Sequence, residues 1–173
     1  MGQVIPEAAE IDSHTLAALP AAAAIVHRIA PWARCYAVPR LQGLCDGEDD
    51  FRYLSGLHRW KDAEDSIILG LLNDEEYLIN TTYHESFHAV DRFIAPLQTG
   101  ILNAAAAQGF SYSEQYLRHP RERLARGFAS WAMARLECPP EPGWRATASV
   151  EKMFSQVESG EMAALVIGAR AAA

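Results

Sequence analysis

The chain has 173 residues, enough for one domain with a buried core, and we interpret residues 1–173 as a single domain. Half of the residues are apolar and 21% are charged, which is typical of a globular protein and excludes a disordered one. The net charge of −7 and the lack of any run of lysine and arginine argue against a nucleic-acid-binding surface.

The N-terminal segment and the cysteines indicate the compartment. The first dozen residues contain three acidic residues and no basic stretch, which does not fit a signal peptide. The alanine-rich run at residues 17–25 is too short to span a bilayer. The three cysteines form no C-x-x-C pair, so neither a disulfide framework nor a cysteine zinc site is indicated. We therefore expect a soluble cytoplasmic protein without membrane contact, or a domain of a larger protein.

The first part of the chain is predicted to form one helix and then short strands. An alanine-rich helix is expected over residues 13–30, with Pro20 marking a kink or a break into two helices. Residues 43–50 are acidic and turn-like. The predicted strands lie at residues 35–38, 51–54 and 65–72, and the last is the strongest because it is an apolar, β-branched run ended by Asn73-Asp74.

The string His84-Glu85-Ser86-Phe87-His88 has the pattern H-E-x-x-H. On a helix, a separation of four residues places both imidazoles on one face, where they can bind a single zinc ion. The intervening carboxylate lies about 100° round the helix, where it can reach a zinc-bound water without being a ligand. The motif therefore predicts two metal ligands, His84 and His88, and a general base, Glu85.

The motif helix is predicted over residues 81–95. One of the polar residues 80–82 would serve as its N-cap, and Pro96 would end it, because proline disfavours helix at the residue before it. Phe87, Val90 and Ile94 share the side that we expect to face the core. The metal-binding stripe would then border this buried side.

From residue 81 onward the sequence predicts helices and no strands. Further helices are expected at residues 100–108, 112–118, 120–137 and 147–169, and the proline-rich segment 139–143 separates the last two. Strands followed by helices indicate an α+β domain, in which a small N-terminal sheet precedes a mostly helical half that carries the H-E-x-x-H helix.

A catalytic zinc site has three protein ligands and an open position, so a third donor is needed. A histidine six residues after His88 would fall at Ile94, which excludes the metzincin spacing. Glu122 is the candidate, because it lies at the head of the apolar stripe of a helix that begins at Pro120, and a buried charge must be paired or bind metal. It could instead be an ordinary first-turn glutamate, and the alternative third ligands are Asp91, Glu114 and His119.

Asp91 lies one turn beyond His88 and has two possible roles. It can accept a hydrogen bond from the imidazole of His88 and fix the tautomer of that ring. It can equally be a solvated acid or a partner of Arg92. The spacing alone does not decide between these roles.

The H-E-x-x-H string, together with Tyr116 and the segment Glu122-Arg123-Leu124-Ala125-Arg126-Gly127-Phe128, resembles the gluzincin metallopeptidases. It is similar in particular to the anthrax lethal factor-like peptidases and to the peptidase domains of large polyvalent phage and plasmid proteins. In those families a tyrosine precedes an E-x-x-A-[ER]-x-F helix whose glutamate is the third zinc ligand. The resemblance covers roughly residues 50–135 and extends to the stretch 56–60, which is similar to the strand placed before the motif helix.

This resemblance implies a zincin-like fold in which Glu122 is the third zinc ligand. It also implies that Tyr116 directs its phenol into the site and stabilises the oxyanion of the tetrahedral intermediate, with Tyr112 in that role if the loop register differs. Position 126 is arginine where the lethal factor-like members have a second acid, so this chain lacks that acid at the matching position.

The sequence therefore predicts a zinc-dependent peptidase that acts on a peptide or protein. The strand at residues 67–72 is expected to form the upper edge of the cleft, where an extended substrate would pair with it. One alternative is a non-catalytic binding module, although such modules usually lose the glutamate or a histidine of the motif. The other is a zinc hydrolase that acts on another amide bond, which a deep closed pocket would favour.

Overall fold

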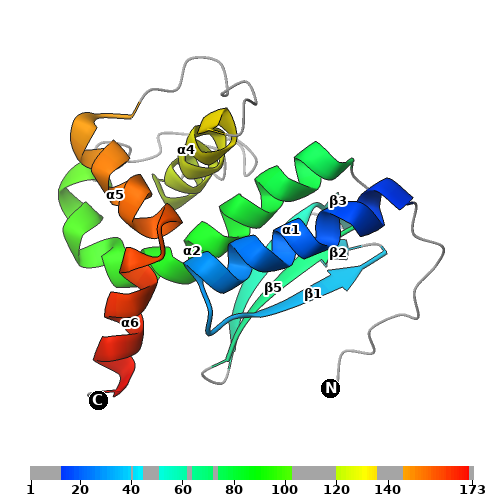
Figure 1. The fold of residues 1–173 in the computed structure, drawn as a ribbon, viewed down its shortest axis with the longest axis horizontal. Coiled ribbons are helices and arrows are strands. Elements are labelled where there is room, and N and C mark those ends of the chain that lie inside the picture. Colours follow the sequence, from blue (N-terminus) through cyan, green and yellow to red (C-terminus); the bar gives the residue numbers. More distant parts are fainter. Residues whose placement is uncertain are drawn as a thin grey trace.

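In the computed structural model, helices α1 and α2 lie side by side across one face of a small sheet, and the later helices gather around one end of α2 (Figure 1). The structure describes residues 13–39, 41–44, 51–61, 64–71, 74–102, 120–135 and 146–171. These ranges form an α+β arrangement that is mostly helical, in agreement with the predicted class at that level. The elements are α1 (Ser13–Ile29), β1 (Arg34–Val38), β2 (Leu41–Leu44), β3 (Phe51–Leu54), β4 (Gly56–Lys61), β5 (Glu64–Gly70), α2 (Glu75–Leu102), α4 (Pro120–Arg135), α5 (Ala148–Glu158) and α6 (Glu161–Ala171).

Strand β5 is the centre of the three-stranded sheet, whose order is β1-β5-β4. It pairs in parallel with β1, where Cys35 lies opposite Ile67, and antiparallel with β4, where Leu57 lies opposite Ile68. The prediction that residues 67–72 form an open edge is therefore wrong, because both sides of β5 are already hydrogen-bonded. Within the described sheet, the outer strand that contacts the motif helix is β4.

Strands β2 and β3 form a separate antiparallel pair, with Leu41 opposite Leu54. Strand β2 was not expected, because residues 43–50 are predicted as a turn. The pair continues where β5 ends, since β2 follows β1 and β3 precedes β4 along the chain. The strands that adjoin β1 and β4 along the chain, β2 and β3, thus pair with each other beyond the end of β5.

The motif helix α2 begins earlier than predicted. Its N-cap is Asp74, whose Oδ1 accepts a hydrogen bond from the backbone N–H of Tyr77 at 2.8 Å. The carbonyl of Asp74 accepts the first helical bond, from Leu78 N–H at 2.9 Å. The expected caps at residues 80–82 lie inside the helix, where the Thr82 hydroxyl donates to the Leu78 carbonyl at 2.7 Å.

Two prolines fail to end the helices that contain them. Helix α2 continues through Pro96 to Leu102, and α1 continues through Pro20, so the predicted end at residue 95 and the possible break of α1 into two helices are both wrong. A proline removes one helical hydrogen bond, but the packing of the flanking turns can outweigh that loss.

The later helices match the prediction in part. Helix α4 agrees with the predicted range 120–137 to within two residues. The single helix expected over 147–169 is instead two helices, α5 and α6, because Gly160 has a positive φ of 80° that a continuous right-handed helix does not allow. The helix predicted at 112–118 lies outside the described residues, as does the range 100–108 beyond residue 102.

A cluster of aromatic rings joins the motif helix to the later helices. The ring centroids of Phe87 on α2 and Phe128 on α4 lie 5.1 Å apart, and Phe154 on α5 lies 5.3 Å from Phe128. All three side chains are fully buried in the core that also includes Ile67 and Leu69 of the sheet. Phe87 lies between the two histidines of the motif in the sequence, so this cluster fixes which side of α2 faces α4.

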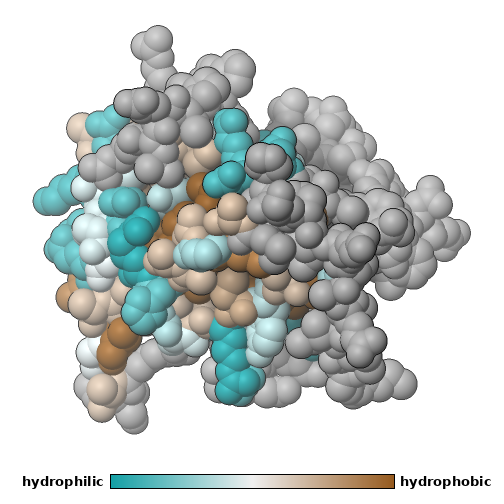
Figure 2. Space-filling view, turned by 45° about the vertical axis from the view of Figure 1, so that its right-hand side comes forward, coloured by the Kyte–Doolittle hydropathy of each residue, from teal (hydrophilic) through white to brown (hydrophobic). Residues whose placement is uncertain are grey.

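On the face drawn in Figure 2, hydrophobic and hydrophilic side chains are interspersed. Large apolar side chains that are exposed among the described residues include Leu165 and Ile167 on α6. None of the described helices combines the length and the apolar character that crossing a membrane requires.

Candidate metal centre

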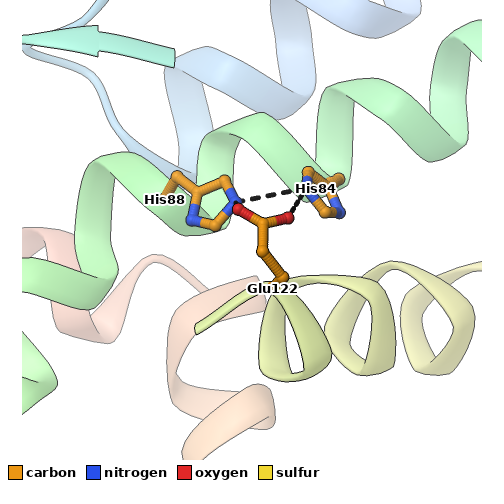
Figure 3. Close-up of side chains that lie close together, drawn as sticks. All are labelled: His84, His88 and Glu122. Carbon is orange, nitrogen blue, oxygen red and sulfur yellow. Dashed lines mark hydrogen bonds and ion pairs between the residues drawn. The ribbon is translucent and has the colours of Figure 1, made fainter. Parts of the chain in front are cut away.

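Two helices bring the three predicted metal ligands together. His84 and His88 project from successive turns of α2, and Glu122 reaches toward them from the first turn of α4, which begins at Pro120 (Figure 3). The helical periodicity of α2 aligns the two rings, and the aromatic cluster described above sets the position of α4 beside them.

The donor atoms lie at distances that suit one ion. His84 Nε2 and His88 Nε2 are 3.1 Å apart. Glu122 Oε2 lies 3.2 Å from the first nitrogen, and Glu122 Oε1 lies 3.2 Å from the second. One ligand atom can be chosen from each residue such that the three atoms all lie within 4.8 Å of one another. Tetrahedral ligands at zinc bond lengths of about 2.0–2.1 Å lie about 3.3–3.4 Å from one another.

An unsatisfied atom supports the fit of a cation. Glu122 Oε2 is buried and makes no hydrogen bond among the described residues, although Nε2 of His84 lies 3.2 Å from it. Buried carboxylate oxygens rarely remain without a donor. The two facing imidazole nitrogens can share only one proton along their axis. A donor set of two imidazoles and one carboxylate matches the ligand preferences of zinc.

Contacts within the site determine the charge states of Glu122 and His88. Burial opposes the ionisation of Glu122, but the adjacent imidazoles outweigh it and hold the pKa of this carboxyl well below its ordinary value. Burial also opposes the charging of His88, but contacts with Asp91 and Glu122 raise its pKa to about 9. Without a metal, His88 therefore carries a proton at neutral pH.

Asp91 supports His88 and is not a partner of Arg92. Its Oδ2 lies 3.2 Å from Nδ1 of His88, the ring nitrogen that faces away from Glu122. Burial raises the pKa of Asp91, but the contacts with His88 and Arg121 lower it by more, so the net pKa is below its ordinary value and the carboxylate stays charged. Arg92 contacts Asp65 instead, at 2.6 Å. Asp91 thus leaves Nε2 of His88 directed at the ligand position.

Glu85, the predicted base, lies on the side of α2 that faces β4. Its side chain is buried, and its Oε2 accepts a hydrogen bond of 2.7 Å from the backbone N–H of His58. Burial raises the pKa of Glu85, although the nearby His84 and His88 oppose that rise. A raised pKa suits a carboxylate that must both accept and return a proton.

Gly56 allows β4 to approach Glu85 this closely. A Cβ atom at residue 56 would lie 2.5 Å from Cγ2 of Thr81 and 2.8 Å from Cγ of Glu85, far inside van der Waals contact. The glycine is therefore required by the contact between strand and helix. Its sequence signal is a glycine at the start of a strand, which often marks a close approach of two backbones.

A second polar cluster next to Glu85 was not anticipated from the sequence. Nε2 of His58 lies 3.1 Å from Oδ1 of Asp65, and Arg92 contacts the other oxygen of the same carboxylate. Burial lowers the pKa of His58, although Asp65 opposes that change. The signal in the sequence is Asp65, an acid two residues before the apolar run of residues 67–69 in the same strand.

Several predicted site residues lie outside the described part of the chain. These are Tyr116, its substitute Tyr112, and two alternative ligands, Glu114 and His119. The oxyanion-stabilising tyrosine therefore stays a prediction. Arg126, where the resemblance would place a second acid, donates from Nε to the carbonyl of Glu122 at 3.3 Å.

Comparison of the chain with protein-family models, with curated proteins and with solved structures found no match. The resemblance to gluzincins therefore stays a prediction from the motif.

Proposed function

We propose that the chain is a zinc-dependent peptidase in which His84, His88 and Glu122 bind the metal and Glu85 is the general base. The observation that carries this proposal is the approach of the Glu122 carboxylate to within 3.2 Å of Nε2 on both motif histidines. Glu122 belongs to a different helix, far along the chain, so this approach is a property of the fold and not of the motif.

The residues around the metal position divide the chemistry between them. A zinc ion bound there would lower the pKa of a coordinated water and polarise a substrate carbonyl. Asp91 accepts the Nδ1 proton of His88 and so presents the lone pair of Nε2 to the ligand position. Glu85 accepts a proton from the attacking water and transfers it to the leaving amine.

The outer edge of β4 supports an extended peptide as the substrate. In an antiparallel pair only every second residue directs its backbone groups at the partner strand. The bond from Gly70 N–H to the Ser55 carbonyl sets this alternation, so Gly56 and His58 direct theirs outward. The backbone N–H of His58 points outward and donates a hydrogen bond to Oε2 of Glu85. A peptide added along this edge would therefore pass the general base.

Two other functions could use the same metal centre: binding without catalysis, and hydrolysis of another amide bond. A binding module has no need of the buried carboxylate of Glu85, which is retained here beside the histidines. The position of the β4 edge beside Glu85 favours an extended peptide over a compact amide. We therefore retain the peptidase as the proposal.

The test combines metal analysis with turnover. The purified chain is expected to contain about one zinc per molecule and to cleave members of a peptide library, and His88→Ala should lose the metal. Glu85→Gln should keep the zinc and lower turnover by about 10²–10⁴-fold, because the amide cannot accept the proton. A chain that takes up no zinc contradicts the proposal, and loss of zinc from Glu85→Gln would make Glu85 a ligand instead of the base.

A further inference from the structure

The first turn of α4 carries a second residue that contacts the motif helix. Arg121, next to Glu122, donates from Nε to Oδ2 of Asp91 at 2.8 Å and from Nη2 to Oδ1. This is the two-pronged contact that a guanidinium makes with a carboxylate. The side chain of Asp91 is 1% exposed and that of Arg121 is 46% exposed, so the guanidinium covers a buried carboxylate from the solvent side.

The contacts form a closed ring across the two helices. Oδ2 of Asp91 contacts both Arg121 and Nδ1 of His88, and Nε2 of His88 contacts Glu122. Because Arg121 and Glu122 are adjacent in the chain, the ring runs from α4 to α2 and returns to α4. The first turn of α4 cannot slide or rotate on α2 without breaking contacts with Asp91 and with the histidines together.

We propose that Arg121 is a positioning residue of the metal centre: its contact with Asp91 holds Glu122 against the two histidines before a metal arrives. This inference rests on the proposed metal centre, but not on which bond the protein cleaves. Residues that orient metal ligands typically change affinity by about 10–100-fold when they are removed.

The test is a zinc titration of the full chain in competition with a chromophoric chelator. Arg121→Met is expected to weaken zinc binding by about 10–100-fold. Arg121→Lys should fall between this variant and the parent, because lysine restores the charge but not the two-pronged contact. Arg123→Met is the matched control, since Arg123 is an exposed residue in the same turn, and it should leave the affinity unchanged.

A spectroscopic measurement separates positioning from general support of the fold. With saturating Co²⁺ in place of zinc, Arg121→Met should alter the visible absorption of the ion, because Glu122 is no longer held in place, whereas Arg123→Met should not. If Arg121→Met and Arg121→Lys lower only the thermal midpoint and leave the zinc affinity and the Co²⁺ spectrum unchanged, the inference is overturned. If the parent chain binds no zinc, the proposed function itself fails, and that result is distinct.

Discussion

The two flanks of the motif helix are both lined with charged and polar side chains, yet they differ in how those side chains are satisfied. On the β4 flank, Asp65 has His58 on one carboxylate oxygen and Arg92 on the other. On the α4 flank, Glu122 has a buried oxygen without a hydrogen bond, and two imidazole nitrogens face each other at 3.1 Å. Both carboxylate oxygens of Asp65 thus have a partner within the protein, whereas a cation at the second cluster would provide the missing partner of Glu122.

This difference teaches how a polar cluster can be assigned a role from its contacts. Buried polar groups that are fully paired stabilise an arrangement and fix it. Donor atoms that converge on one point and leave a buried oxygen without a hydrogen bond indicate a ligand instead. The motif helix shows both: the β4 flank holds Glu85, the proposed general base, through the N–H of His58, and the α4 flank presents the proposed metal ligands.

The largest expected effect comes from changing one carboxylate on each flank. Glu122→Gln should abolish stoichiometric zinc binding, because the amide removes the anionic ligand while preserving its shape. Asp65→Asn should keep the zinc but lower the free energy of unfolding by about 3–5 kcal/mol, because it removes the countercharge of the buried contact with Arg92. Zinc analysis and denaturant unfolding measure the two outcomes. If folded Asp65→Asn loses zinc as fully as Glu122→Gln, the two flanks do not differ in the way we infer.

A smaller effect is expected from Gly56→Ala, which pushes β4 away from the motif helix. The added methyl would lie 2.5 Å from Thr81 and 2.8 Å from Glu85, so the strand or the carboxylate must move. A displacement of the base of about 1 Å can lower turnover by about 100-fold. The zinc content should not change, because the ligands lie on the other flank.

The control for this substitution is Gly168→Ala on α6, where an added Cβ would meet nothing within 4 Å. It should leave turnover unchanged and stabilise the helix by up to about 1 kcal/mol. Equal loss of turnover in both variants would show that the effect of Gly56→Ala is not local to Glu85.

The parts of this molecule that the sequence predicted are those set by local periodicity. The spacing of His84 and His88 places them on one helical face wherever the helix begins, and Pro120 indicates the start of the helix that carries Glu122. The exact ends of α2 were less accessible, because Asp74 and residues 80–82 are all acceptable caps. In the structure the N-cap is Asp74, which adds nearly two turns to the helix before the first histidine.

Contacts between elements could not be read in the same way. The position of β5 depends on β1 and β4 pairing with it from both sides, and no local pattern in β5 specifies its partners. The same holds for Arg121, which contacts Asp91 across two helices, and for Asp65, which is satisfied by a strand and by a helix. In the sequence, Arg121 and Asp65 cannot be distinguished from other charged residues, because their partners are determined by the fold.

The last prediction concerns pH and the α4 flank alone. In the metal-free protein the pKa of His88 is raised to about 9, so below that pH a metal must displace a proton from the ring. Zinc affinity should therefore rise about tenfold per pH unit from pH 7 toward 9 and level off above it. Titration calorimetry in buffers of different ionisation enthalpy should detect about one proton released per zinc at pH 7.5.

The same proton stabilises the metal-free fold: this contribution is fully present below the ordinary histidine pKa near 6.5 and is lost as the pH rises through about 9. Metal-free protein should thus become less stable over the range in which zinc binding tightens, and an affinity that does not change between pH 7 and 9 would contradict a protonated His88 at the empty site.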